Sequence, residues 1–162
     1  FSSAVLILSV FPSCSAGSFI LPADSLLSPP LYYEEYEDLV DSFNKNIDDE
    51  ITLSSPKKGE YRSAIVVEDV DSDGHQEAIV FYKKKSDVSV ARMHYFDFIS
   101  ERWVSFGDFN GYGSGIENVE ITDMDLDGKK EIVVVWNTSG SSSGNILTVY
   151  RLDTVSNKLF FS

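Results

Sequence analysis

The 162-residue chain contains one cysteine, two histidines and only 13 basic residues against 26 acidic ones. A single cysteine excludes a disulfide within the chain, and with two histidines it provides too few nitrogen and sulfur ligands for a zinc site. The formal net charge of −13 argues against nucleic acid as a partner, because phosphate binding requires clustered Lys and Arg side chains.

The residues that most often carry out catalysis are also scarce, and none of them forms a recognisable arrangement. His75 lies within an acidic segment, and His94 lies in the middle of a predicted strand, where a structural role is expected. The glycine-rich segment Gly107–Gly115 lacks the Lys-Ser/Thr ending of a phosphate-binding loop and is predicted to be a flexible connection. The sequence therefore predicts that this chain is not an enzyme.

What the sequence does contain is an acidic segment that occurs twice. The pattern D-x-D-x-D-G-x-x-E starts at Asp69 and again at Asp123. Apolar β-branched residues flank both copies, so each is predicted to be a loop between two strands. Alternate carboxylates of an extended chain project to one side, where a divalent cation would relieve their repulsion. Glycine at the sixth position allows a sharp turn. Each loop is therefore expected to bind one Ca²⁺.

The expected ligands are the four acidic side chains of each loop and the main-chain carbonyl of its seventh residue. They are Asp69, Asp71, Asp73, Glu77 and the His75 carbonyl in the first loop, and Asp123, Asp125, Asp127, Glu131 and the Lys129 carbonyl in the second. An EF-hand begins alike, but it has helical flanks and a bidentate glutamate at position 12, where this chain has Val80 and Val134. A solvated acidic turn is the remaining alternative, and the repetition argues against it.

The similarity between the two halves extends beyond the acidic loops. Met93–Phe106 aligns with Thr148–Phe161, and each segment shows alternating apolar positions, a polar turn and a second aromatic-rich strand. One unit therefore contains a strand, the acidic loop, a strand, a longer connection, a strand, a turn and a strand. Four antiparallel strands that recur at roughly 40–50 residues are typical of a β-propeller blade.

These features resemble the FG-GAP/VCBS-type repeats of integrin-α-like β-propellers. The resemblance rests on the two acidic loops and on Phe106–Gly107 ahead of the second loop, after which no G-A-P follows, and it covers about Tyr61 to Phe161. It implies an all-β fold of two four-stranded propeller-like blades, residues 59–110 and 111–162, with Ca²⁺ bound by the residues named above. Two blades cannot close a propeller, so the chain is expected to be a fragment of a longer protein, and two units packed as a small open sandwich are the alternative.

The segment that precedes Leu31 has the composition of an export signal and an anchor. Residues 1–13, whose apolar run Ala4–Phe11 is too short to span a bilayer, are predicted to be a truncated signal peptide. Cys14 follows this run as the lipidated cysteine of a bacterial lipobox would, and residues 14–30 are predicted to be a flexible tether. Ordinary cleavage near Ala16 is the alternative. The protein is therefore expected to be exported and anchored to the cell membrane through lipidated Cys14, on its extracytoplasmic face.

Residues 31–50 are predicted to form an amphipathic helix, because apolar side chains recur at intervals of three and four from Tyr32 to Ile47. The polar face of this helix is acidic, which disfavours a helix that lies on a membrane. We therefore expect the helix to dock on the first blade and to cover an exposed sheet edge.

Together these features predict a calcium-binding, non-enzymatic lipoprotein for adhesion, ligand binding or envelope scaffolding. An extracellular protein or a glycan is the expected kind of ligand. The alternative is a calcium-stabilised accessory region of a surface enzyme that acts on polysaccharide or peptide, with the catalytic domain elsewhere in a longer chain.

Overall fold

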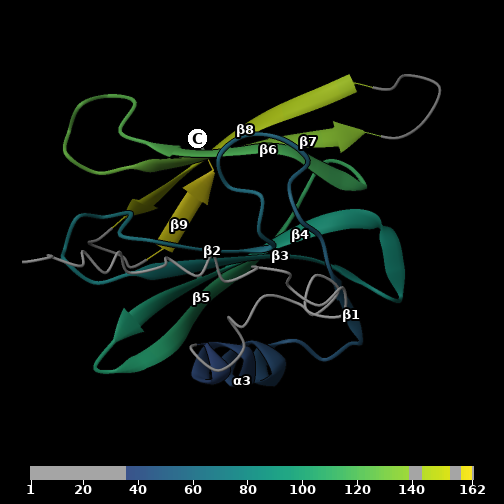
Figure 1. Ribbon diagram of the computed structural model, residues 1–162, viewed down its shortest axis with the longest axis horizontal. Coiled ribbons are helices and arrows are strands. Elements are labelled where there is room, and N and C mark those ends of the chain that lie inside the picture. Colours follow the sequence, from purple (N-terminus) through teal and green to yellow (C-terminus); the bar gives the residue numbers. More distant parts are fainter. Residues whose placement is uncertain (1–35, 139–143, 154–157, 162) are drawn as a thin grey trace, which may run out of the picture. The chain divides into compact units, whose positions relative to one another are not determined.

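The computed structural model describes residues 36–138, 144–153 and 158–161 (Figure 1). The predicted signal peptide, Cys14 and the predicted tether lie outside these residues. The fold described is that of the compact unit Tyr36–Ser162.

The described strands form two antiparallel sheets, which confirms the predicted all-β class. The first sheet contains β1 (Ile51–Leu53), β2 (Ile65–Glu68), β3 (Glu77–Lys84), β4 (Asp87–Ile99) and β5 (Arg102–Asn110). The second sheet contains β6 (Gly115–Thr122), β7 (Glu131–Thr138), β8 (Gly144–Asp153) and β9 (Lys158–Phe161), paired in chain order. The predicted four strands of the first unit, β2 to β5, are also paired in chain order, but β1 adds a fifth strand.

The added strand β1 is short and shares one edge of β3 with β2. Leu53 of β1 pairs with Tyr82, whereas Ile65 of β2 pairs with Val80. So short a segment, with a polar residue between two apolar ones, carries no strand signal of its own, which is why the sequence does not predict β1.

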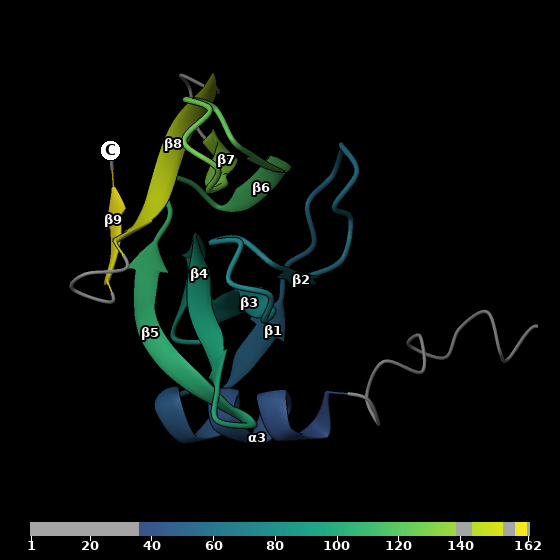
Figure 2. The same ribbon diagram turned by 90° about the vertical axis from the view of Figure 1, so that its left-hand side faces the viewer.

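The second sheet, the first sheet and the helix α3 (Glu37–Asn46) form successive layers in both views (Figures 1 and 2). Alternate side chains of β3 enter two different hydrophobic cores. Ile79 and Phe81 face the second sheet, whereas Ala78, Val80 and Tyr82 face α3. Because both of its faces are covered, β3 is an almost continuous apolar run rather than an alternating one.

The two sheets pack against each other through faces that are not equivalent in the two units. Because Asp123 is the equivalent of Asp69, Ile132 of β7 is the equivalent of Ala78, and Val133 is the equivalent of Ile79. The second sheet presents its Ile132 face to the first sheet, whereas the first sheet presents its Ile79 face to the second. The helix therefore covers the face of the first sheet that corresponds to the inner face of the second.

The helix α3 lies inside the predicted range 31–50 but ends at Asn46, because Ile47 is already extended. Its buried residues are Leu39 and Phe43, and the Phe43 ring packs edge-on against Tyr82 with the ring centres 5.1 Å apart. The helix thus covers a face of the first sheet. The helix also lies against the edge strand β5, where Ser42 Oγ donates to the Trp103 carbonyl at 2.9 Å, so its docking includes one edge of the first sheet.

The glycine-rich segment Gly107–Gly115 is not the flexible connection that its composition predicts. Its first residues belong to β5, and the amide of Gly111 donates to the Ala91 carbonyl at 2.8 Å. A Cβ atom at Gly111 would lie 2.4 Å from the buried Trp136 ring, so only glycine allows this approach. The segment is therefore a packed link between the sheets.

The register of β8 also corrects the predicted alignment of the two units. Ile79 pairs with Tyr95 in the first sheet, and the equivalent Val133 pairs with Val149 in the second. The sequence offset that relates the two loops therefore also relates β4 to β8. Met93 thus corresponds to Leu147 rather than to Thr148. The predicted alignment was one residue out of register, which exchanges the two faces of the strand.

We expect Gly111→Ala to lower the free energy of unfolding by about 1–3 kcal/mol, because the methyl group would overlap the Trp136 ring in a packed core. The matched control is Gly115→Ala, since no atom lies within 4 Å of a Cβ at that position. Urea denaturation of both variants measures the difference. Equal midpoints for the two variants would contradict the packed link.

Candidate metal centres

The two acidic loops have the same backbone conformation. The fourth residue of each loop, Ser72 or Leu126, has a φ of 62°, and the following glycines, Gly74 and Gly128, have φ values of 90° and 93°. Glycine adopts such values at little cost, whereas leucine and serine do so rarely. The repeated sequence pattern therefore encodes a repeated local structure.

The loops also share a set of hydrogen bonds from backbone amides to the acidic side chains. In each loop the glycine amide donates to the first aspartate, the seventh amide to the third aspartate, and the second amide to the glutamate. The acceptors are Asp69, Asp73 and Glu77 in the first loop and Asp123, Asp127 and Glu131 in the second. Each of these carboxylates keeps a second oxygen with which it can bind another group.

In the first loop the structure brings together one oxygen each from Asp69, Asp71 and Glu77, all within 4.8 Å of one another. Glu77 is only 1 % exposed, and its Oε2 accepts from the Val70 amide at 2.5 Å. Its Oε1 and the Oδ1 of Asp69 are buried and have no hydrogen-bond partner among the described residues. Buried carboxylate oxygens without partners are costly, and a bound cation would satisfy them.

The pKa values of the first loop show that its carboxyl groups are costly to ionise, chiefly because they are buried. Burial raises the pKa of Glu77 to about 8. Burial and the nearby charge of Asp73 raise the pKa of Asp71. The positive charge of Lys129 lowers this pKa, but offsets the increase only in part. The pKa of Asp97 on β4 is also raised, chiefly by burial and then by the negative charge of Asp71. Asp97 is the cross-strand neighbour of Glu77 in the register of β3 and β4, and it was not among the predicted ligands. An acidic residue inside the apolar run of β4 was the only signal for it.

The second loop differs because an arginine from β8 enters it. Its cluster consists of Asp123, Asp125 and Asp127. Glu131 is 2 % exposed, and its Oε1 accepts from Arg151 Nη2 at 2.7 Å. The same guanidinium nitrogen donates to Asp125, and this hydrogen bond lowers the pKa of the Asp125 carboxyl. Arg151 was not predicted to take part in the site.

The predicted ligands are thus assembled only in part by the structure. The first cluster does not include Asp73, and the second does not include Glu131. The roles of the His75 and Lys129 carbonyls stay predictions, since the hydrogen bonds that place these two residues in the loops come from their amides.

Two direct contacts join the second loop to the first. The amide of Lys130 donates to the Val70 carbonyl at 2.8 Å, and its ammonium lies 2.6 Å from Glu68 Oε1. Because the Val70 amide donates to Glu77, the same residue is bonded to both acidic loops. A conformational change in either loop can therefore be transmitted to the other through the hydrogen bonds of Val70.

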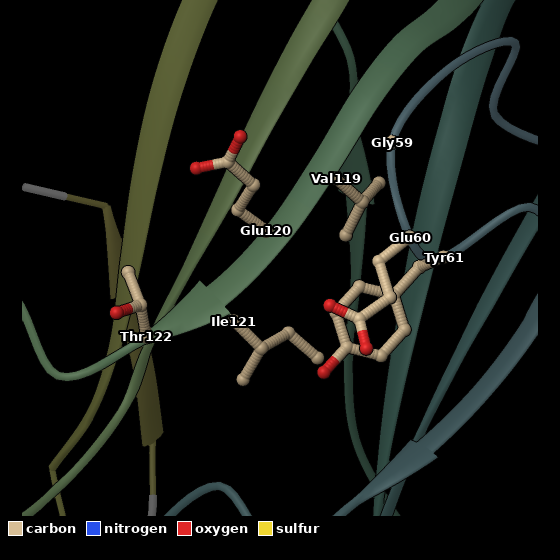
Figure 3. A pocket seen from close by; sticks show the side chains of 7 residues that line it. All are labelled: Gly59, Glu60, Tyr61, Val119, Glu120, Ile121 and Thr122. Carbon is tan, nitrogen blue, oxygen red and sulfur yellow. The ribbon is translucent and has the colours of Figure 1, made fainter.

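A separate pocket of about 330 Å³ lies between residues 59–61 and β6, and Figure 3 shows Ile121 directed toward Tyr61. Its lining consists of Gly59, Glu60, Tyr61, Val119, Glu120, Ile121 and Thr122. The lining contains neither a histidine nor a cysteine, the usual base and nucleophile of covalent catalysis. The acidic loops are therefore the better candidate site.

His94 is buried against the helix and not in a cleft. Its Nε2 lies 2.8 Å from Ser105 Oγ, its ring stacks on Phe96, and burial lowers its pKa. These contacts describe a neutral core histidine, as the sequence predicts.

Comparison with known proteins finds no relative: no family model, no curated protein and no solved structure matches this chain. The function must therefore be inferred from the acidic loops and from the fold that positions them.

Without divalent cations, the stability of the protein should fall as the pH rises from about 5 to about 8. The folded pKa of Glu77, about 8, lies above its ordinary value of 4.5, so the folded state binds the extra proton in this interval. The slope from this group is about 1 kcal/mol per pH unit. Urea denaturation in EDTA at several pH values measures it.

In the same experiment Glu77→Gln should flatten the pH profile and raise the stability at pH 8, because the buried charge is removed. The control is Glu131→Gln, which should lower the stability, because that carboxylate is paired with Arg151. Parallel profiles for the wild type and Glu77→Gln would contradict the assignment.

Proposed function

We propose that this protein is a calcium-binding, non-enzymatic module of an exported lipoprotein, in which the two acidic loops are the cation sites. The observation that carries the proposal is the buried carboxylate of Glu77. One of its oxygens is bonded to the loop backbone. The other has no hydrogen-bond partner among the described residues, and neither does Oδ1 of Asp69, which belongs to the same cluster of three carboxylates. A cation at this point would neutralise the buried charge and satisfy both oxygens.

Calcium suits these donors better than other biological cations. The donors are carboxylate oxygens, the ligands of hard cations, whereas zinc prefers nitrogen and sulfur. Calcium accepts roughly 6–8 oxygens in variable geometry, which a set of loop side chains, carbonyls and waters can supply. Magnesium requires a stricter octahedron and keeps its waters. We therefore propose Ca²⁺ for both loops.

The bound calcium would stabilise the fold as well as the loop. The first loop joins β2 to the central strand β3, and the unfolded chain has no preformed site. Binding free energy is then folding free energy, so the stability should depend on the calcium concentration by mass action.

The stacking of the two sheets supports the resemblance to FG-GAP/VCBS-type repeats and a propeller-like arrangement of blades. Each unit of four strands, β2–β5 and β6–β9, runs up and down in chain order. The contact between the sheets is head to tail, with the Ile79 face of one against the Ile132 face of the other. Blades that repeat around a common axis need this kind of contact, because every blade must offer one face to each neighbour.

The biological role that we propose is adhesion, ligand binding or scaffolding at the cell envelope, with an extracellular protein or a glycan as the ligand. Lipidated Cys14 would attach the protein to the membrane on its extracytoplasmic face. Within the part of the chain that the structure describes, no helix is long and apolar enough to cross a bilayer. The composition of residues 1–30 and the predicted lipobox support the anchor.

We expect calorimetric titration of EDTA-treated protein to detect calcium binding, and magnesium to substitute poorly for it. Asp71→Asn should weaken binding at the first loop by about tenfold or more, because a charged ligand is lost. The matched control is Asp41→Asn, which removes the same charge from an exposed position of α3. A wild-type protein that shows neither binding heat nor thermal stabilisation with millimolar calcium would reject the proposed function.

A further inference from the structure

The strand beside each loop contributes one residue that differs between the two candidate sites. Asp97 pairs with Glu77 between β4 and β3. In the second sheet Ile132 pairs with Tyr150, so the next step of the antiparallel register places Arg151 beside Glu131. Asp97 and Arg151 are therefore equivalent positions, separated by the same interval as the two loops. An acidic residue in the first unit is replaced by a basic residue in the second.

The guanidinium of Arg151 lies against carboxylates of the second loop. Its guanidinium donates to Asp125 and, at 2.7 Å, to Glu131 Oε1. Oδ1 of Asp123 accepts from the Asp127 amide at 3.2 Å. A guanidinium is permanently charged and can bridge two carboxylates, so it compensates part of the negative charge of this loop, at Asp125 and Glu131, without a metal.

The first loop has no such compensation at the equivalent atoms. Oε1 of Glu77 and Oδ1 of Asp69 are the counterparts of the two satisfied oxygens, and both are buried with no hydrogen-bond partner in the described part of the chain. Asp97 adds negative charge where Arg151 brings positive charge. The same loop backbone is therefore held in two opposite electrostatic surroundings.

We propose that the strand residue beside the loop glutamate decides which cation neutralises each loop. Asp97 leaves the first loop to a calcium ion, whereas the Arg151 guanidinium pairs with the buried Glu131 and with Asp125 of the second loop from within the chain. The inference rests on the proposed function and refines it, because the two sites become unequal. Calcium must compete with the guanidinium for Asp125 and Glu131 in the second loop, so the first loop binds calcium tightly and the second weakly.

Because the two sites are unequal, the two loops have different structural roles. The second loop is joined to β8 through Arg151 without a metal, so this link does not depend on the calcium concentration. The first loop is completed only by calcium, so the attachment of β2 to β3 depends on the ion. Since Val70 is bonded to both loops, the second loop also gives the first a fixed support.

The test is calorimetric titration of the full EDTA-treated chain with Ca²⁺ alone. The wild type should show one tight binding event. Arg151→Met keeps a long unbranched side chain and removes its charge, and should strengthen binding at the second loop by about ten- to a hundredfold, so that a second event appears. Arg151→Lys, the matched control, keeps a positive charge and should keep a single tight event.

Asp97→Asn tests the other half of the inference. It should weaken the tight event by about tenfold, because a negative charge beside the ion is lost, and should leave the second loop unchanged. Near-UV circular dichroism checks that each variant is folded. If Arg151→Met is folded only with calcium, the recovery of its spectrum on titration reports binding at the second loop, and Arg151→Gln provides an independent variant.

The outcomes separate the inference from the proposed function. Two equal binding events in the wild type, or an Arg151→Met protein that gains no second event, would overturn the inference and leave calcium binding intact. No calcium binding by either the wild type or Arg151→Met would reject the proposed function itself.

Discussion

A buried glutamate at the start of a central strand is the constraint on which both halves of the structure depend. Glu77 begins β3 and Glu131 begins β7, and each closes its loop by accepting the amide of the second loop residue. The position is buried because both faces of the adjoining strand are packed or shielded. A glutamate held there is neutralised either by a proton, as the raised pKa of Glu77 shows, or by a paired cation such as Arg151, since burial of an unpaired charge costs several kcal/mol. Loop conformation, strand pairing and cation choice all follow from this requirement.

The stacking of the sheets explains why equivalent loops lie in different surroundings. The first sheet is covered on one face by α3 and on the other by the second sheet, whereas the second sheet has the first sheet on one face. Because equivalent faces are not paired with each other, identical positions in the two units meet different neighbours. Met93 is fully buried, for example, while its equivalent Leu147 is 59 % exposed. A repeated sequence can thus acquire two functions from one local structure.

Much of the fold and of each loop could be predicted, because the deciding interactions are local. Within a single short segment, alternate aspartates, a glycine and a glutamate specify the turn at Gly74 or Gly128 and the amide bonds that stabilise it. Runs of β-branched and aromatic residues between turn segments specify the four antiparallel strands of each unit. The short strand β1, the packing at Gly111 and the face covered by α3 could not be predicted, since they depend on contacts between segments far apart in the chain.

The register of one strand separates what is encoded locally from what requires the whole fold. Matching of aromatic residues between the units makes Arg151 the equivalent of Phe96, on the face away from the acidic loop. The hydrogen-bonded register of β7 and β8 moves it by one position, so that it is the equivalent of Asp97 and enters the loop. Side chains alternate between the faces of a strand, so a slip of one position decides whether the neutral Leu152 or the positive Arg151 lies beside the buried glutamate. The acidic pattern determines where a cation is needed, and only the pairing of distant strands decides whether the chain supplies it.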